Sequence, residues 1–311
     1  MSKVFAYWYQ HDEGHGNFGD ELNPYLIQKL SNSTVIWVNP NYLVNSRFLA
    51  CKMFIHRVLM QKKGFKNIFD GPEWLSLVRK KIVIPIGSII SQYAEGRVVV
   101  WGSGLLQSDA TIYNADFRAV RGRYTQDRIK KLGYRVPEVL GDPALLLPLV
   151  YPPSTEKKFK VGIIPHYVHF EQFQKEFEGS DVLVINLLEP IEKVIDLIVS
   201  CEITYSTSLH GVIVSHAYEV PSIWITHDVI TNRLQLAGDN IKFKDYFSSV
   251  DIPEYEPINI QEILNAKESI TPHSLKKIED VLLPSSAKIK SIQKELVKCA
   301  PFPVDKDKIS L

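Results

Sequence analysis

Cysteine is scarce in this chain. The 311 residues include three, Cys51, Cys201 and Cys299, which stand far apart and form no CxxC pair. A disulfide framework is therefore not expected, and the sequence favours a reducing compartment. The patterns HExxH, Cys/His cluster and GxSxG are also missing. Their absence leaves zinc hydrolysis and the usual serine hydrolase chemistry without support, and no metal is implied.

A surplus of positive charge is missing as well. Lys and Arg number 36 against 35 Asp and Glu, which gives a formal charge of +1. A nucleic-acid binder normally needs a basic surplus to neutralise phosphates, so that class is not expected. A local basic pocket for a small anion stays compatible with this balance.

Long apolar runs are absent too. No stretch approaches the ~18 residues of a membrane span, and the first residues do not resemble a signal peptide, so we expect a cytoplasmic protein. One segment, residues 51–66, mixes cations with apolar side chains. It has two interpretations: a solvated helix with one buried face, or a peripheral contact with the inner face of an anionic membrane. The segment contains Lys52, Arg57, Lys62, Lys63, Lys66, Phe54, Ile55, Val58 and Leu59.

What the chain does have is a regular alternation of short apolar runs and helical patterns. Its composition, 45% hydrophobic and 23% charged, is that of a globular protein. Several runs are continuously apolar, as parallel strands covered on both faces are. The pattern predicts an α/β protein with doubly wound parallel sheets. The expected strands are 4–9, 34–38, 82–86, 98–101, 161–164, 181–185, 203–205 and 222–225, and the expected helices are 22–30, 125–132, 170–177, 190–199 and 209–218.

A break in this alternation predicts two domains. Residues 147–160 contain three prolines and a charge cluster, and a new strand starts directly afterwards. We expect one Rossmann-like domain over residues 1–150 and a second over 151–311, with a ligand cleft between them. The last sixty residues are predicted to be helices and loops that pack back on the first domain.

Two loops in the first half follow predicted strands, where open α/β sheets bind ligands. In the loop at 15–25, Asn17 and Asp20 carry short polar groups to the start of a helix; alternatively, Asp20 merely caps that helix. In WGSGLL (101–106), Gly102 and Gly104 flank Ser103, and their backbone amides can approach an anion closely.

Two further loops carry cations and hydroxyls. Arg121 and Arg123 flank a glycine at a helix start and can clamp a carboxylate or phosphate; alternatively, they are two surface arginines. The stretch 206–211 (STSLHG) sets hydroxyls and His210 at a helix N-terminus, which is an anion site; alternatively, a serine merely caps the helix. His166 holds the corresponding place after the first strand of the second half.

Taken in order, these loops resemble the polysaccharide pyruvyl transferase family. The matching pieces are NFGDELNPYL (17–26), WGSGLL (101–106), VRGRYT (120–125), LGDPALLLP (140–148), GIIPHY (162–167) and SLHGVIVSHAYEVPSIWI (208–225). The resemblance implies a GT-B-like pair of Rossmann domains and phosphoenolpyruvate as donor and co-substrate, without a cofactor. The implied product is a sugar carrying ketal-linked pyruvate, on a polysaccharide or its precursor, which includes a lipid-linked oligosaccharide.

The resemblance also implies roles for residues. Leu209, His210 and Arg121 are the expected donor contacts. Many members carry an arginine before the Leu-His pair, where this chain has Ser208. Either this chain belongs to a subgroup with a serine there, or another cation covers the charge of the donor, with Arg123 and Arg233 as candidates. The donor side is predicted to comprise Arg121, Arg123, Leu209, Ser208, Gly102, Ser103, Gly104 and His166, and the acceptor side Asn17, Asp20 and Glu21.

The chemistry fits these residue types. Phosphoenolpyruvate carries about three negative charges, which calls for arginines and helix-end amides. His210 is a candidate phosphate ligand and acid, and Asp20 a candidate base for the acceptor hydroxyl. A helix N-terminus lowers the pKa of a histidine, whereas a bound phosphate raises it, and the sequence leaves the balance open.

Other functions remain open at this point. A nucleotide-sugar glycosyltransferase on the same architecture would be stabilised by a nucleotide diphosphate, and a non-catalytic sugar- or anion-binding protein would release no phosphate. Enolpyruvyl transfer is a chemical variant, which carbon NMR distinguishes from ketal formation. The acceptor sugar and the oligomeric state are not specified by the sequence.

Overall fold

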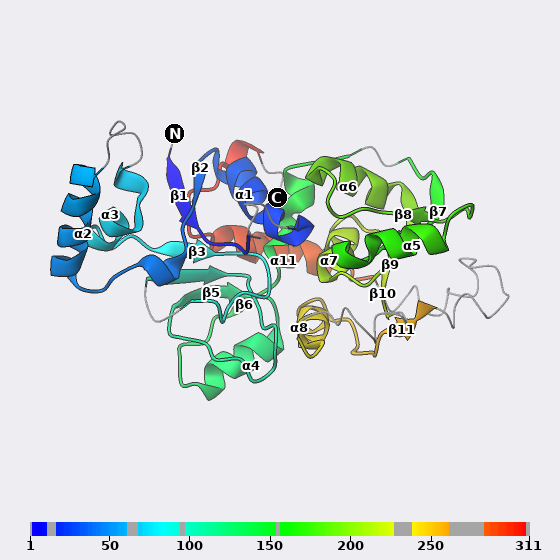
Figure 1. Cartoon of the computed structure of the whole chain (residues 1–311). Coiled ribbons are helices and arrows are strands. Elements are labelled where there is room, and N and C mark those ends of the chain that lie inside the picture. The colour runs from blue at the N-terminus through cyan, green and yellow to red at the C-terminus, as the bar shows by residue number, and fades with distance from the viewer. Residues whose placement is uncertain are drawn as a thin grey trace.

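Two all-parallel sheets lie side by side in the computed structural model (Figure 1). The structure describes residues 2–10, 17–60, 68–93, 97–153, 156–226, 238–260 and 283–308. Within these ranges the first sheet has the order β2-β1-β3-β4-β5-β6 and the second the order β11-β10-β9-β7-β8. The strands of the first sheet are β1 (Lys3–Ala6), β2 (Thr34–Trp37), β3 (Ile82–Ile84), β4 (Val98–Trp101), β5 (Asp116–Val120) and β6 (Val139–Leu140). Those of the second are β7 (Phe159–Ile164), β8 (Leu183–Val184), β9 (Cys201–Ser206), β10 (Ser222–Thr226) and β11 (Ile258–Asn259).

The central strands of the first sheet are buried, as expected of parallel strands. All residues of β3 and β4 are buried, because helices cover both faces of the sheet. The predicted α/β class with two Rossmann-like parallel sheets is therefore confirmed, and the side-by-side arrangement fits a GT-B-like layout. The sequence prediction missed β5, whose first three residues alternate charged and aromatic; the first two are half-buried and the third is exposed. It also missed β6 and β11, each two residues long.

Helices connect the strands. The predicted helix around 51–66 begins earlier, at Arg47, and its residues 61–66 lie outside the described part of the chain. The described α-helices are α1 (Phe18–Ser31), α2 (Arg47–Met60), α3 (Pro72–Leu77), α4 (Arg123–Lys131), α5 (Phe170–Glu176), α6 (Ile191–Val199), α7 (Leu209–Ala217), α8 (Ile241–Ser249) and α11 (Ser286–Lys298). A 3₁₀-helix, η3 (Pro143–Leu149), precedes β7 in the sequence.

One hydrophobic cluster runs through both halves of the molecule. It contains Leu22 and Ile27 of α1, Val212 of α7 and Ile292 of α11. Glu192 of α6 accepts a hydrogen bond from the hydroxyl of Tyr25 (2.9 Å) and forms an ion pair with Lys29 (3.0 Å), both on α1. The two sheets are therefore held together by packing as well as by the chain. The division into domains at residues 150 and 151 stays a prediction.

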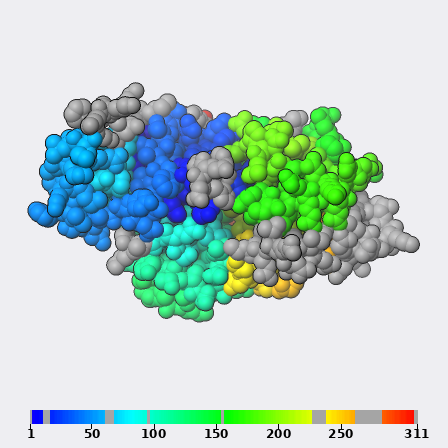
Figure 2. All heavy atoms as spheres, in the orientation of Figure 1, coloured from blue at the N-terminus to red at the C-terminus, as the bar shows by residue number. Residues whose placement is uncertain are grey.

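Two elements of the second half of the sequence reach the first sheet. The indole Nε1 of Trp101, at the end of β4, donates to the carbonyl of Leu296 in α11 (3.0 Å). Helix α8 follows β10 in sequence but packs against α4, and Figure 2 shows it in yellow beside the first half. As a result, loops at the carboxyl ends of β4 and β5 face α7 and α8.

Candidate active site

Helix α1 starts with a reciprocal cap. Asn17 is the N-cap residue: its Oδ1 accepts hydrogen bonds from the amides of Gly19 (2.9 Å) and Asp20 (3.3 Å). The Oδ2 of Asp20 accepts one from the amide of Asn17 (3.3 Å), which completes a capping box. Asn17, and not Asp20 as the sequence analysis considered, is therefore the N-cap residue of α1. Glu21 lies in the same first turn and is half-buried.

The turn that follows is fixed by Asn23, which is fully buried. Pro24 has no N–H to donate to the carbonyl of Asp20, so this carbonyl loses its usual helical partner. The Nδ2 of Asn23 donates to it instead (2.9 Å), and the Oδ1 of Asn23 accepts from the amide of Ile86 beyond β3 (2.7 Å). The start of α1 is therefore anchored to the sheet.

Asp20 lies in this anchored turn and is 8% exposed. Burial raises the pKa of its carboxyl to about 7; the amide of Asn17 acts in the opposite direction, and the charge of Glu21 adds to the rise. Burial raises the pKa of Tyr7, which follows β1, and of Tyr167, which follows β7, and the charges of Tyr9 and Asp20 add to both increases. Asp20 is therefore a carboxyl that can exchange a proton near neutral pH, close to both halves.

Helix α7 starts beside the ends of two paired strands. The amide of His166, after β7, donates to the Oγ1 of Thr207 (2.8 Å), after β9. The hydroxyl of Ser206 accepts from the amide of Ser208 (3.0 Å). Ser208 is the N-cap residue by position, but its side chain makes no capping hydrogen bond. The hydroxyl of Ser208 therefore does not cap α7.

The starts of α1 and α7 face each other. A Cβ added to Gly19 would lie 2.1 Å from the Nδ1 of His210, so the imidazole rests directly on the backbone of α1. Leu209, next to it, is buried in the core. Both helix N-termini carry partial positive charge. The structure thus brings Asn17, Asp20 and His210, predicted from distant segments, to one place.

His210 has a carboxyl as its neighbour. Its Nε2 lies 3.8 Å from the Oδ2 of Asp142, at the start of η3, and neither atom has a hydrogen-bond partner among the residues that the structure describes. Burial lowers the pKa of His210 to about 3, and the charges of Arg121 and Lys242 act in the same direction. Burial raises the pKa of Asp142 to about 6. Without a ligand, His210 is therefore neutral at pH 7.

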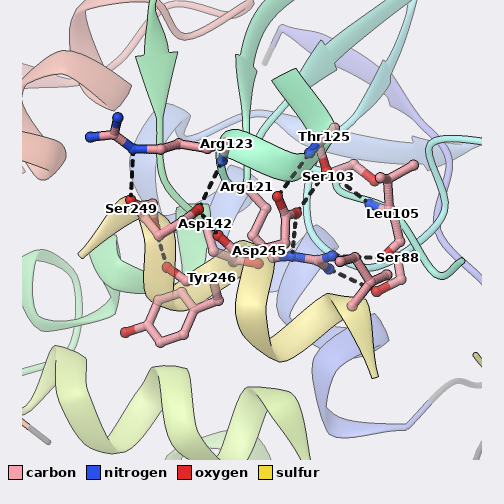
Figure 3. A network of polar contacts seen from close by, with 12 residues as sticks. Ser88, Ser103, Leu105, Arg121, Arg123, Thr125, Asp142, Asp245, Tyr246 and Ser249 are labelled. Atoms are coloured by element: carbon pink, nitrogen blue, oxygen red, sulfur yellow. Dashed lines mark hydrogen bonds and ion pairs between the residues drawn. The ribbon is translucent and has the colours of Figure 1, made fainter. Parts of the chain in front are cut away.

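Arg121, at the end of β5, is fully buried and held by three partners (Figure 3). Its Nε donates to the Oδ2 of Asp245 in α8 (3.1 Å), with Nη1 donating to the hydroxyl of Ser88 (2.7 Å) and Nη2 to the carbonyl of Leu105 (2.6 Å). Thr125 donates to the same carboxylate from its amide (2.9 Å) and its hydroxyl (2.7 Å). Arg121 therefore ties the first sheet to α8.

Lys242 lies one turn before Asp245 on α8, so the two share a helix face. Burial lowers the pKa of Lys242 to about 8, with the charge of Arg121 adding to the decrease. The ammonium lies 5.5 Å from the ring centre of Phe243, and no carboxylate of the described residues forms an ion pair with it. Because Asp245 already neutralises Arg121, the charge of Lys242 has no counter-ion within the part of the chain that the structure describes.

Two predicted parts of the donor site do not join this cluster. Arg123 is exposed, its Nε donates to the carbonyl of Ser248 (3.3 Å), and its guanidinium points away from that of Arg121 in Figure 3. The amides of Gly102 and Gly104 donate to the carbonyls of Ala119 and Gly87 (2.8 and 3.0 Å), so they are already engaged within the protein. The anion clamp of two arginines with assisting glycine amides is thus not assembled in this structure.

The glycines have a packing role instead. A Cβ on Gly104 would lie 2.6 Å from the guanidinium carbon of Arg121, and one on Gly102, whose φ is +102°, would lie 2.1 Å from Pro143. Ser103 between them is fully buried and donates to the carbonyl of Gly87 (2.8 Å). The WGSG segment therefore makes room for Arg121. Arg233, the second candidate for compensation, lies outside the described residues.

Three charged residues of the site were not among the predicted ones. Asp142 stands two residues after β6 in the GDPA segment that the sequence analysis quoted, and that segment was a usable signal even though β6 itself was not predicted. Lys242 and Asp245 belong to a nine-residue helix with no motif, more than a hundred residues after Arg121 in sequence. Only the packing of α8 against α4 brings them to the site.

The described residues offer no group of three or more His, Cys, Asp or Glu side chains suited to a metal ion. In the same ranges, no helix combines the length and the apolar character that crossing a bilayer requires.

Comparison with known proteins gives one curated relative. The uncharacterized protein L143 of Acanthamoeba polyphaga mimivirus is 33% identical over 171 residues, which are 52% of this chain and 58% of the relative. The match thus spans little more than half of that protein's length. None of the solved structures compared matches the chain.

A family model covers the segment that contains these loops. The model described as "Polysaccharide pyruvyl transferase" matches residues 17–229, from the cap of α1 to just beyond β10. This segment is well over half of the chain and includes Asp20, Arg121, Asp142 and His210. The chain therefore belongs to the polysaccharide pyruvyl transferase family.

Proposed function

We propose that this protein transfers pyruvate from phosphoenolpyruvate to two hydroxyls of a sugar, forming a ketal. The observation that carries the proposal is the half-buried ammonium of Lys242, which has no acidic partner among the described residues and acts electrostatically on His210 together with Arg121. A partly desolvated charge without a counter-ion is unfavourable, and a bound anion would compensate it.

The proposed donor site combines this cation with two helix starts. Phosphoenolpyruvate carries about three negative charges, and the N-termini of α1 and α7 add oriented backbone dipoles. Lys242 supplies the charge that the family resemblance assigns to an arginine before Leu209, where this chain has Ser208. The hydroxyl of Ser208 makes no capping bond, which leaves it available to a ligand oxygen. His166 and Leu209 flank the same helix start.

The proposed reaction uses His210 and Asp20 on opposite reactants. Protonation of the donor's methylene carbon makes the neighbouring carbon electrophilic, and a sugar hydroxyl adds there after giving up its proton. Phosphate then leaves, and a second hydroxyl closes the ketal and passes its proton to the released phosphate. We assign the acid to His210, whose pKa a bound phosphate raises from its low value, and the first base to Asp20. Asn17 and Glu21 lie on the acceptor side of this arrangement.

A thermal-shift titration with phosphoenolpyruvate tests the donor. A ligand at ~100 times its Kd stabilises the folded state by about 2.7 kcal/mol, which moves Tm by a few degrees. We expect this shift with phosphoenolpyruvate and not with pyruvate or a nucleotide diphosphate. Lys242→Met should abolish it, because the surplus charge is lost. Lys244→Met is the matched control on the same helix: Lys244 pairs with Glu256 (2.6 Å) and should keep the shift.

The outcomes separate the competing functions. Stabilisation by a nucleotide diphosphate alone would reassign the protein to glycosyl transfer, and no response to any of these ligands would contradict the donor site. Phosphate release in the presence of a sugar acceptor, with a ketal carbon in the NMR spectrum of the product, would establish the reaction itself.

The pH dependence of turnover tests Asp20. A base with a pKa of about 7 is protonated below that pH, so kcat should fall as pH decreases through 7. Asp20→Asn should reduce kcat by about 100-fold or more and remove this limb of the profile. An amide oxygen can still accept from the amide of Asn17, and it avoids burying a charge, so Tm above pH 7 should not decrease. Unchanged turnover in Asp20→Asn would limit Asp20 to the capping box.

A further inference from the structure

Helix α2 has an unusual outer face. Among its 14 residues, the described side chains include one that is buried, Ala50. Phe48, Ile55 and Leu59 are 83%, 52% and 76% exposed. Ile55 lies about two helical turns after Phe48, and Leu59 about three turns after it. The three side chains therefore form one apolar stripe on the solvent side. A helix that is merely solvated would carry polar residues there.

The other face of α2 is already occupied. The rings of Phe54 and Trp74 of α3 lie 5.3 Å apart, and the guanidinium of Arg57 forms an ion pair with Glu73 (2.8 Å). In Figure 1 these two helices form the outermost end of the first half, with α3 between α2 and the sheet. Figure 2 shows α2 at the edge of the molecule, away from the site between the halves. The apolar stripe is thus directed outward and is distinct from the face that holds the helix in place.

The charge around the stripe has one sign. From Leu22 to Phe69 the sequence contains no Asp or Glu, whereas α2 carries Arg47, Lys52 and Arg57. Arg57 is paired with Glu73, but neither Arg47 nor Lys52 forms an ion pair with any residue that the structure describes. Lys52 lies one turn after Phe48 and flanks the stripe. Apolar residues flanked by unpaired cations are the composition of helices that lie in the headgroup layer of an anionic bilayer.

The same charges argue against a second copy of the chain as the occupant. A symmetric dimer through this face would place the cations of one helix against those of its partner. Like charges at an interface are destabilising, whereas anionic lipid headgroups neutralise them. We propose that α2 docks this protein onto an anionic lipid bilayer, with Phe48, Ile55 and Leu59 entering the headgroup layer and Arg47 and Lys52 contacting lipid phosphates.

Co-sedimentation with lipid vesicles tests this proposal. We expect the full-length protein to pellet with vesicles of phosphatidylcholine and phosphatidylglycerol, and much less with phosphatidylcholine alone. Phe48→Ser combined with Leu59→Ser should weaken the binding about tenfold or more. Lys52→Gln should weaken it roughly fivefold, and only on anionic vesicles. Leu188→Ser is the matched control, because Leu188 is 60% exposed on the second half and should leave binding unchanged.

Each result bears on the proposal. The replaced side chains are exposed, so the variants should keep the wild-type Tm, which confirms that they fold. Equal pelleting of wild type and the double variant would overturn the proposal. The proposal would also be overturned if the wild-type protein did not bind vesicles and light scattering showed a dimer that the double variant does not form. Donor binding measured by thermal shift should be the same in all of these variants, so this test is independent of the proposed reaction.

Discussion

Replacing His210 by alanine is expected to lower the rate of pyruvyl transfer by about 100-fold or more, the usual contribution of a positioned acid or base. The imidazole lies between the start of α1 and the carboxyl of Asp142, and burial keeps its pKa near 3 without ligand. A bound phosphate would favour the protonated ring, because two opposite charges then meet in a site of low polarity. The measurement is kcat with saturating phosphoenolpyruvate.

A second variant separates chemistry from structure. His210→Asn keeps a polar side chain of similar length but cannot deliver a proton at neutral pH, so it should lose as much activity as His210→Ala while keeping Tm. Asp142→Asn should lower kcat more than it changes KM, because Asp142 faces the imidazole. Near-normal turnover in His210→Ala would remove His210 from the chemistry and leave it at most a ligand of the phosphate.

The second large effect concerns the fully buried ion pair between Arg121 and Asp245. Asp245→Ala should lower the free energy of unfolding by about 3–5 kcal/mol, because it leaves the guanidinium of Arg121 buried without its counter-ion. The change also removes the acceptor for the amide and hydroxyl of Thr125. Urea unfolding gives the free energy, and an unchanged m-value would show that the unfolded state is the same.

Two comparisons support that measurement. Glu256→Ala breaks an exposed ion pair to Lys244 on the same helix and should have a far smaller effect. The double variant Arg121→Met/Asp245→Leu removes both charges and should recover part of the loss, since apolar residues of similar volume often replace a buried pair without penalty. If Asp245→Ala were as mild as Glu256→Ala, Arg121 would not depend on this pair.

Much of the architecture was predictable because its signals are local. Continuous apolar runs such as 82–84 and 98–101 marked the parallel strands, and polar loops after them marked the edge of the sheet where we propose that the ligand binds. The helix starts after Gly19 and at Ser208 were also visible, since each depends on a few neighbouring residues, although the first helix begins earlier than expected and its cap is Asn17 rather than Asp20. The family resemblance then ordered these loops and matched the segment that the family model covers.

The electrostatics of the site were not predictable in the same way. Arg121 is an arginine before a glycine in the sequence, and nothing local states that a carboxylate more than a hundred residues later neutralises it. That pairing changes the role expected of Arg121, because an arginine neutralised by a carboxylate adds little net charge to the site. The role of Lys242 is also hidden in the sequence. Its position one turn before Asp245 indicates that it lies at the site only once α8 is known to pack against α4. Long-range packing therefore decides which cation is free to bind a ligand.

The return of α11 to the first sheet bears on the order in which the protein is made. Trp101 bonds to the carbonyl of Leu296, Gln293 donates to the carbonyl of Leu145 (2.7 Å), and the amide of Asp305 donates to the carbonyl of Leu30 (2.8 Å). During synthesis, domains usually fold from the N-terminus onward as they leave the ribosome. Here the earlier sheet gains its contacts with α11 only after the described strands of the second sheet have been translated. The sheet that is translated first is therefore completed only after the strands of the other sheet have been made.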